Sequence, residues 1–338
     1  GHARSDQPFH QFLCLNSGSE SVEIASRISD INAWNHVRPG GPKEGQKVKF
    51  LALRGAFHGR TSRPAQVSHS TRPKYEAALA SFQDTDNLIV VEPNSVESLE
   101  AAFAKAESEG VFIESMFLEP VMGEGRPGRS TSRAFYDAAR RLTKAHGALL
   151  IVDSIQAGLR ATGALSIVDY PGFEDCEGPD METWSKALNA GQYPLSVLGM
   201  NERAAAIYVR GVYGNTMTGN PRAIEVACTV LARFTPTLRQ NIRDQGARFV
   251  AGLQALQADF PHIIQSVEGT GLLFCCELDP ERYPVTGTGG VEEQLRLRGI
   301  GVIHGGTNAL RFTPNFDIST PEVELVLSEV RALFTLLA

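Results

Sequence analysis

The sequence lacks any apolar run that approaches the roughly 20 residues of a membrane-spanning helix. Its N-terminus has no basic segment followed by an apolar one, as a secretory signal would. A basic stripe is also missing, because 32 Lys and Arg residues are mixed with 38 Asp and Glu residues along the chain. These absences argue against a membrane partner and against a nucleic-acid partner.

Cysteine is scarce, with five residues in a chain of 338. The five are scattered over the sequence: Cys14, Cys176, Cys228, Cys275 and Cys276. The adjacent pair would point to opposite faces of any strand that carries it. This usage argues against a disulfide framework and a zinc site, and it favours a reducing compartment. We therefore expect a protein of the cytoplasm or of an organelle matrix.

Short apolar runs alternate with longer amphipathic stretches, which is typical of βαβ units. Strands are predicted at residues 47–54, 87–91, 115–118, 148–152 and 195–200. Helices are predicted at residues 96–107, 132–145 and 221–233. The run at 148–152 is apolar on both faces, as a central parallel strand should be. The predicted fold class is α/β, with a mostly parallel sheet flanked by helices.

The pattern changes after about residue 235. One long helical stretch is followed by strand-like pieces at 263–278, 301–304 and 308–313, and by a closing helix from Thr320. We therefore predict a large domain over residues 1–234 and a smaller C-terminal α+β domain over residues 235–338.

Lys186 stands between a polar segment and a loop that contains glycine and proline. A partly buried lysine can form a Schiff base when desolvation or a cationic neighbour lowers its pKa. The alternative is a solvated surface lysine. Asp153 directly follows the central strand, where open α/β sheets bind ligands. A pyridine cofactor such as pyridoxal 5'-phosphate needs an acid on its ring nitrogen, although an aspartate there can also cap the next helix.

Two further segments have the composition of ligand-binding turns. Residues 15–20 form a Gly/Ser turn before a helix, which suits a phosphate group, and Ser17 with Glu20 has the spacing of a capping box. In the segment 56–61, Phe57 could stack on a cofactor ring and Arg60 could clamp a carboxylate. Taken singly, each of these residues is more often a packing or surface residue.

Together these motifs resemble one family, the class III aminotransferases of the ornithine, acetylornithine and 4-aminobutyrate type, which have pyridoxal phosphate fold type I. Seven motifs follow the order of the family over nearly the whole chain. They are N-S-G-S-E at 16–20, F-H-G-R-T at 57–61, E-P-V-M-G-E-G at 119–125, D-S-I-Q-A-G at 153–158, S-K-A-L at 185–188, G-N-T-M-T-G-N-P at 214–221 and L-R-F-T-P at 310–314.

The resemblance implies pyridoxal 5'-phosphate as the cofactor, with Lys186 forming the Schiff base and Asp153 bound to the pyridine nitrogen. These two residues are the predicted catalytic pair. The predicted cofactor contacts are Gly18, Ser19, Phe57, His58, Asp153, Gln156, Lys186 and Thr216. Gly18 and Ser19 would hold the phosphate of their own subunit, whereas Thr216 would reach the phosphate of a neighbouring subunit. The resemblance therefore implies a homodimer with a shared active site.

The predicted substrate-binding residues are Arg60, Glu119, Glu124 and Arg311. Arg311 would bind the α-carboxylate of glutamate or 2-oxoglutarate, and Glu124 would pair with Arg311 when the bound substrate has no carboxylate there. The implied reaction moves an amino group from an ω-amino acid or amine to 2-oxoglutarate. The alternative for Glu124 and Arg311 is a pair of unrelated surface charges.

The sequence also departs from the family pattern. Ser154 stands where most relatives have Glu, Thr218 where they have Gly, and Arg160 lies one place earlier than the usual arginine. The family's long segment before the N-S-G motif is expected to be absent from this chain. Two other hypotheses follow: a different reaction on the same cofactor, such as a racemase, aminomutase or decarboxylase, or a truncated homologue without catalysis.

Overall fold

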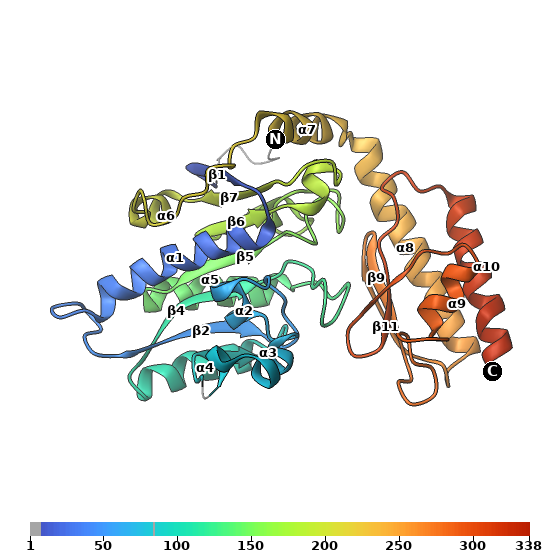
Figure 1. Ribbon diagram of the computed structural model, residues 1–338, viewed down its shortest axis with the longest axis horizontal. Coiled ribbons are helices and arrows are strands. Elements are labelled where there is room, and N and C mark those ends of the chain that lie inside the picture. The colour runs from blue at the N-terminus through green and yellow to red at the C-terminus, as the bar shows by residue number, and fades with distance from the viewer. Residues whose placement is uncertain (1–7, 84) are drawn as a thin grey trace. The chain divides into compact units, whose positions relative to one another are not determined.

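The computed structural model describes residues 8–83 and 85–338, and the chain divides into two compact units (Figure 1). The first unit runs to Pro120 and adds Thr131–Gly158 and Leu165–Leu231. The second unit comprises Val121–Ser130, Leu159–Ala164 and Ala232–Ala338. The domain boundary at residues 234 and 235 stays a prediction, since these units meet along the chain at residues 231 and 232.

The first unit is built around a seven-stranded sheet in the part of the chain that the structure describes. Its strands are β1 (Gln11–Leu15), β2 (Lys47–Leu53), β3 (Leu88–Val91), β4 (Val111–Leu118), β5 (Leu149–Asp153), β6 (Met181–Trp184) and β7 (Ser196–Met200). The order is β1-β7-β6-β5-β4-β2-β3, with β6, β5, β4, β2 and β3 parallel to one another. Strand β7 is antiparallel to both β6 and β1. The predicted mostly parallel sheet is confirmed.

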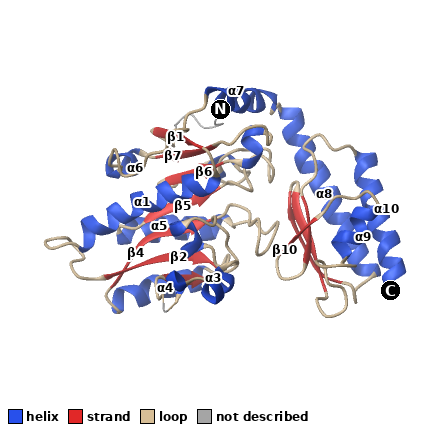
Figure 2. Ribbon diagram, in the orientation of Figure 1, coloured by secondary structure: helices blue, strands red, loops and turns tan. Residues whose placement is uncertain are grey.

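Helices cover both faces of this sheet (Figure 2). The first unit contains α1 (Gly18–Val37), α2 (Ser62–Val67), α3 (Arg72–Ala78), α4 (Val96–Ser108), α5 (Arg133–His146), α6 (Glu202–Ile207) and α7 (Pro221–Arg233). Short 3₁₀ turns lie at η1 (Ala80–Phe82), η2 (Ile167–Asp169) and η3 (Lys186–Asn189). The predicted helices at 96–107, 132–145 and 221–233 are confirmed as α4, α5 and α7.

The order of the strands explains which helices share a face. The connection from β1 to β2 through α1 crosses the sheet in one direction, whereas those from β3 to β4 through α4 and from β4 to β5 through α5 cross it in the other. Because such crossovers are right-handed, α1 lies on one face of the sheet and α4 and α5 lie on the opposite face.

The central strand shows why the strand predictions from apolar runs succeed. All five residues of β5 are buried, so each side chain contributes apolar area on one face of the sheet or the other, apart from the terminal Asp153. The predicted strands at 47–54, 87–91, 115–118, 148–152 and 195–200 are confirmed as β2, β3, β4, β5 and β7. Strands β1 and β6 have no counterpart among the predicted strands.

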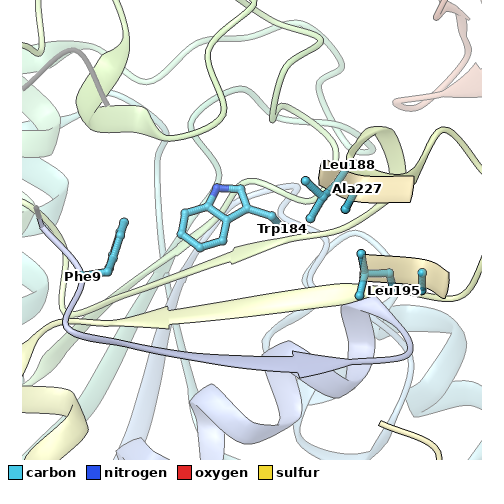
Figure 3. Close-up of a cluster of buried hydrophobic side chains, with 6 residues drawn as sticks. Phe9, Trp184, Leu188, Leu195 and Ala227 are labelled. Carbon is cyan, nitrogen blue, oxygen red and sulfur yellow. The ribbon is translucent and has the colours of Figure 1, made fainter. Parts of the chain in front are cut away.

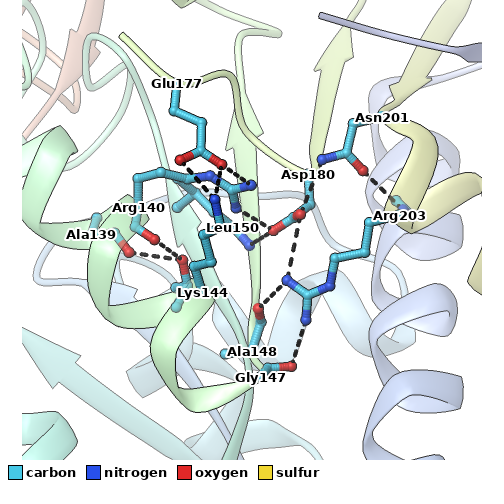
Figure 4. Close-up of polar contacts among 12 residues, drawn as sticks. Ala139, Arg140, Lys144, Gly147, Ala148, Leu150, Glu177, Asp180, Asn201 and Arg203 are labelled. Carbon is cyan, nitrogen blue, oxygen red and sulfur yellow. Dashed lines mark hydrogen bonds and ion pairs between the residues drawn. The ribbon is translucent and has the colours of Figure 1, made fainter.

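A buried carboxylate holds the amino ends of β5 and β6 together (Figure 4). Asp180, immediately before β6, has no exposed surface. It accepts hydrogen bonds from Arg140 Nη1 at 2.7 Å, Leu150 N at 2.9 Å and Asn201 Nδ2 at 3.1 Å. The carboxylate thereby connects α5, β5 and the start of α6, and its negative charge is balanced by a guanidinium.

The second unit has a four-stranded antiparallel sheet with helices, again within the described residues. Its elements are α8 (Pro236–Asp259), β8 (Ile264–Thr270), β9 (Leu273–Leu278), α9 (Val291–Leu297), β10 (Ile303–Gly305), β11 (Ala309–Phe312) and α10 (Thr320–Leu337). Phe249, Phe274 and Phe312 form a stack in its core, with ring centroids 4.6 Å and 5.2 Å apart. The predicted small α+β domain fold is confirmed.

Two general findings concern the predictions from composition. In residues 8–83 and 85–338, every helix is too short or too polar to cross a membrane. All five cysteines are free thiols, and Cys275 and Cys276 lie side by side on β9, where burial raises the pKa of the Cys275 thiol to about 12. A thiol with so high a pKa is a poor nucleophile at neutral pH.

Candidate active site

A cavity of about 330 Å³ opens in the first unit at the carboxyl ends of β5 and β6. Seven of the eight predicted cofactor contacts line this cavity: Gly18, Ser19, Phe57, His58, Asp153, Gln156 and Lys186. The eighth, Thr216, is exposed on the segment before α7 and does not line it. The fold thus brings together residues from four separate motifs.

The N-terminus of α1 forms one wall of the cavity. Ser17 is the N-cap, and its Oγ accepts from Glu20 N at 3.3 Å. The Glu20 carboxylate accepts from Asn16 N at 2.8 Å, one residue before the atom that a standard capping box would use. A Cβ atom on Gly18 would lie only 2.7 Å from Ile155 Cδ1. A larger residue at position 18 would therefore make the Ile155 side chain shift where α1 approaches the end of β5.

Asp153 ends β5 and is 4% exposed. Its Oδ2 lies 2.8 Å from His58 Nδ1, and its Oδ1 accepts from Ile155 N at 3.1 Å and from Thr183 Oγ1 at 3.3 Å. Since a carboxylate only accepts hydrogen bonds, Nδ1 is the protonated nitrogen of His58 in this pair. The Nε2 atom of His58 is buried and has no hydrogen-bond partner among the described residues.

The sequence alone did not reveal this partnership. His58 and Asp153 are 95 residues apart in the chain, and a single histidine carries no spacing signal. Only its position at a strand end beside Phe57 could have pointed to it. The structure gives His58 a defined contact: it orients the Asp153 carboxylate inside the cavity.

Lys186 lies two residues beyond β6, at the start of η3. Its φ is 41°, in the left-handed region that residues other than glycine rarely adopt. Such a conformation costs on the order of 1–3 kcal/mol and is often found at functional sites. The residue is exposed, as in the alternative of a solvated lysine that the sequence left open, but it lines the cavity. Lys186 is exposed because the cavity opens beside its side chain.

An apolar cluster anchors the loop that carries Lys186 (Figure 3). Its buried members are Phe9, Trp184, Leu188, Leu195, Ala223 and Ala227. Ser185 Oγ also donates to Leu195 O at 2.6 Å, which closes the loop across its base. Packing on both sides of Lys186 thus holds its backbone in the strained conformation, because the neighbouring side chains cannot move without leaving the cluster.

A second carboxylate, absent from the predicted site, supports the end of β5. Glu182 of β6 has no exposed surface, and its oxygens accept from Ser154 Oγ, Ser166 Oγ and Ile167 N. Ser154 N also donates to Thr183 O at 3.0 Å. The Ser154 position that departs from the family pattern therefore binds a glutamate supplied by the next strand.

The predicted residues at the ends of β2 and β4 make contacts with one another. Phe57 N donates to Glu119 Oε1 at 3.0 Å, and Glu119 is 2% exposed. Arg60 is exposed, with its guanidinium carbon 5.6 Å from the centre of the Phe57 ring. Glu119 therefore fixes the Phe57 backbone, and neither Glu119 nor Arg60 lines the cavity.

The other two predicted substrate residues lie in the second unit. Arg311 Nη1 lies 3.4 Å from Glu124 Oε2 and also donates to Gly123 O. Arg160 donates to Pro314 O at 2.7 Å and lies over the Phe316 ring at 4.6 Å, while burial lowers the pKa of Arg160 to about 10. The ion pair predicted between Glu124 and Arg311 is present, and its role in substrate exchange stays a prediction.

Comparison with known proteins identifies the family. The sequence model of the aminotransferase class-III family matches residues 3–334 of this chain. The chain belongs to the class III aminotransferases. It is therefore an enzyme of a family whose cofactor is pyridoxal phosphate.

Individual relatives agree with this assignment. The acetylornithine aminotransferase of Thermosynechococcus vestitus is 32% identical over 331 residues, which cover 97% of this chain and 75% of that protein. The acetylornithine aminotransferase of Xanthomonas campestris is 30% identical over 95% of this chain and 73% of its own length. The structure of ornithine aminotransferase from Toxoplasma gondii superposes with a TM-score of 0.80 at 25% identity, covering 97% of this chain and 73% of that one.

The residues around the cavity suit this class III cofactor. The α1 N-terminus, with Gly18 and Ser19 on the cavity wall, offers backbone N–H groups to a phosphate. The buried Asp153 carboxylate can accept a hydrogen bond from a protonated ring nitrogen. Lys186 lines the same cavity, and a lysine amine can form a covalent bond to an aldehyde.

Proposed function

We propose that this chain transfers an amino group from an ω-amino acid or amine of the ornithine, acetylornithine or 4-aminobutyrate type to 2-oxoglutarate. One observation carries the proposal: the Lys186 amine, the Asp153 carboxylate and the N-terminus of α1 line a single cavity. The relatives that act on acetylornithine and ornithine support the choice of donor class.

When bound, pyridoxal phosphate supplies an aldehyde that condenses with amines and a ring that draws electrons from the substrate. Lys186 Nζ would hold the cofactor covalently through that aldehyde until the incoming substrate amine takes its place. The freed Nζ then acts as general base and takes a proton from the carbon that carries the amino group. The exposure of Lys186 beside the cavity supports this movement, because the amine can leave and return without disturbing the core.

Asp153 keeps a proton on the ring nitrogen of the cofactor. Its carboxylate is buried, so its charge acts over a short distance in a medium of low polarity. The hydrogen bonds from His58 and Thr183 restrain the carboxylate, which supports a fixed direction for the oxygen atoms. A preorganised group of this kind does not have to reorient during the reaction.

The remaining predicted cofactor contacts concern the phosphate, the ring and the ring hydroxyl of pyridoxal phosphate. Gly18 and Ser19 would bind the phosphate, Phe57 would stack on the ring and Gln156 would bind the ring hydroxyl. Thr216 binds the phosphate of a neighbouring subunit, so the active enzyme is a homodimer. The exposed position of Thr216 supports this role, since its side chain is accessible to another chain.

Arg311 binds the α-carboxylate of glutamate or 2-oxoglutarate, and Arg60 binds the other carboxylate. Glu124 takes Arg311 as its partner when the amino donor has no carboxylate there, and the 3.4 Å ion pair supports this exchange. Glu119 contributes by holding the Phe57 backbone. We also propose a reducing compartment such as the cytoplasm, in line with the free thiols.

The test combines a covalent trap with an assay. The protein is incubated with pyridoxal phosphate, reduced with borohydride and digested, and mass spectrometry is expected to find the cofactor on the peptide with Lys186. Ornithine, acetylornithine or 4-aminobutyrate with 2-oxoglutarate should then yield glutamate. A racemised, rearranged or decarboxylated donor without glutamate would favour another reaction on the same cofactor. A trapped cofactor on a different lysine would overturn the assignment.

A further inference from the structure

Glu20 binds two segments that lie far apart in the sequence. Its Oε2 accepts from Asn16 N at 2.8 Å, in the turn that leads into α1. Its Oε1 accepts from Asn215 Nδ2 at 2.8 Å, across 195 positions of the chain. The carboxylate is half-buried, and both of its oxygens are in use. A single side chain therefore joins the predicted phosphate turn to the segment before α7.

The side chain and backbone of Asn215 also shape the turn that contains Thr216. Asn215 Oδ1 accepts from Met217 N at 3.0 Å, and Asn215 O accepts from Thr218 Oγ1 at 2.9 Å. These bonds close the chain around Thr216, whose side chain remains exposed. Asn215 thus orders the turn with one end of its amide and attaches it to Glu20 with the other.

Helix α1 contacts the same segment further along its length. Arg27 Nη1 donates to Val212 O at 2.8 Å, and its guanidinium carbon lies 5.6 Å from the centre of the Tyr213 ring. Burial raises the pKa of the Tyr213 hydroxyl, a hydrogen bond with the Asn215 side chain opposes the rise, and the Glu20 carboxylate adds to it. Residues 212–218 are therefore held against α1 at several points.

We propose that Glu20 and Asn215 are positioning residues: they hold the turn that presents Thr216 in a fixed relation to the phosphate turn of the same chain. The inference rests on the proposed function, in which residues 18 and 19 bind one phosphate and Thr216 binds that of the neighbouring subunit. In a dimer, one chain would contact one phosphate through residues 18 and 19 and the other phosphate through Thr216. The Glu20–Asn215 hydrogen bond would keep these two contacts at a fixed distance from each other. Neither Glu20 nor Asn215 lines the cavity.

The test reverses the donor and the acceptor of the hydrogen bond. In Asn215→Asp two carboxylates face each other, and in Glu20→Gln one of the two accepted bonds is lost, so each single variant should bind pyridoxal phosphate about tenfold more weakly. In the double variant Glu20→Gln/Asn215→Asp, the amide introduced at position 20 can donate to the carboxylate introduced at position 215, while its oxygen accepts from Asn16 N. The affinity of the double variant should return to within about twofold of the wild-type value.

Asn220→Asp is the matched control. Asn220 Oδ1 accepts from Arg222 N at 3.0 Å, the same local bond that Asn215 makes with Met217, whereas the amide that binds Glu20 is that of Asn215. The control should leave the dissociation constant unchanged, as measured by the absorbance of apo-protein titrated with pyridoxal phosphate. Failure of the double variant to recover affinity, with its fold intact by circular dichroism, would overturn the proposal. If Asn215→Asp does not fold, Asn215→Ala replaces it as the single variant.

A second measurement separates positioning from general stability. Thr216→Ala should weaken cofactor binding in the wild type and add little in Asn215→Asp, because the turn is already displaced there. Full additivity of the two changes would refute a link between Asn215 and Thr216. The proposed function fails separately: in that case wild-type protein shows no borohydride-trapped cofactor on Lys186, whatever the Asn215 variants do.

Discussion

The two ends of the β5 and β6 strand pair use buried carboxylates in opposite ways. At the amino end, Asp180 faces the Arg140 guanidinium at 2.7 Å, and its charge is balanced within the protein (Figure 4). At the carboxyl end, Asp153 faces His58 and Thr183 beside a cavity. The first arrangement stabilises the fold, whereas the second leaves a negative charge for a bound ligand to balance.

The two ends of the β5 and β6 strand pair also differ in backbone strain. Lys186, with its left-handed φ of 41°, belongs to the carboxyl end, next to the cavity. The amino end instead joins strands and helices through the three hydrogen bonds that the Asp180 carboxylate accepts. Stability and reactivity are therefore separated along one pair of strands, and substitutions at both ends test this separation.

The largest effect is expected for Lys186→Ala. Removing both the covalent anchor and the general base should lower the transamination rate on the order of 10⁴-fold, the upper range for acid–base catalysis. The melting temperature without cofactor should change little, because the side chain is exposed. Lys105→Ala, also at an exposed lysine, serves as the control. Trapped cofactor in Lys186→Ala at the wild-type level would contradict the assignment.

Asp153→Asn should follow in size. The amide is nearly the same shape but carries no charge, so the rate should fall by about 10²–10⁴-fold, as for loss of a key electrostatic contact in an active site. Cofactor should still bind, because the phosphate contacts remain. Single-turnover absorbance measurements would follow proton removal from the substrate, and an undiminished rate would remove Asp153 from its role.

Asp180→Asn should lower the stability of the fold and leave the catalytic rate unchanged, the opposite of Asp153→Asn. Loss of one partner of a buried ion pair typically costs about 3–5 kcal/mol of unfolding free energy. Urea denaturation should therefore show a large decrease in stability. The folded fraction should retain a wild-type rate, since Asp180 lies at the strand end away from the cavity. A stable variant with impaired catalysis would break the proposed separation.

Glu114 on β4 offers a smaller, pH-dependent effect. Burial raises the pKa of Glu114 from 4.5 to about 7, although the Arg63 guanidinium opposes the rise. The folded protein therefore keeps the proton over a pH range in which the unfolded chain has lost it. Stability should decrease as the pH rises through this range, by roughly 1–3 kcal/mol in total.

The Glu114 prediction is checked by denaturation at several pH values from about 4 to about 8, which bracket the pKa of 4.5 in the unfolded chain and of about 7 in the folded protein. Glu114→Gln, which cannot ionise, should flatten the profile. Glu109→Gln, at an exposed glutamate, should keep the wild-type slope. An unchanged slope in Glu114→Gln would show that another group titrates.

The local sequence pattern is sufficient to predict a strand or helix wherever a segment is apolar on both faces or amphipathic along its length. The residues of β5 and of α5 carry that signal within the segment itself, and the predicted positions agree with the structure. The apolar pattern did not predict strand β6, because two of its four residues, Glu182 and Thr183, are polar. Both are fully buried, since hydroxyl and backbone groups of neighbouring segments donate hydrogen bonds to Glu182.

The sequence by itself determined the α/β class, because residue type and short spacings decide it, and the order of the motifs, whose family resemblance points to the lysine and the aspartate that line the cavity. Only the tertiary structure decided that His58 binds Asp153, that Glu182 supports Ser154 and that Glu20 joins Asn215. Those contacts unite residues that lie far apart in the chain. Their partners are chosen by the path of the folded chain, which no local pattern encodes.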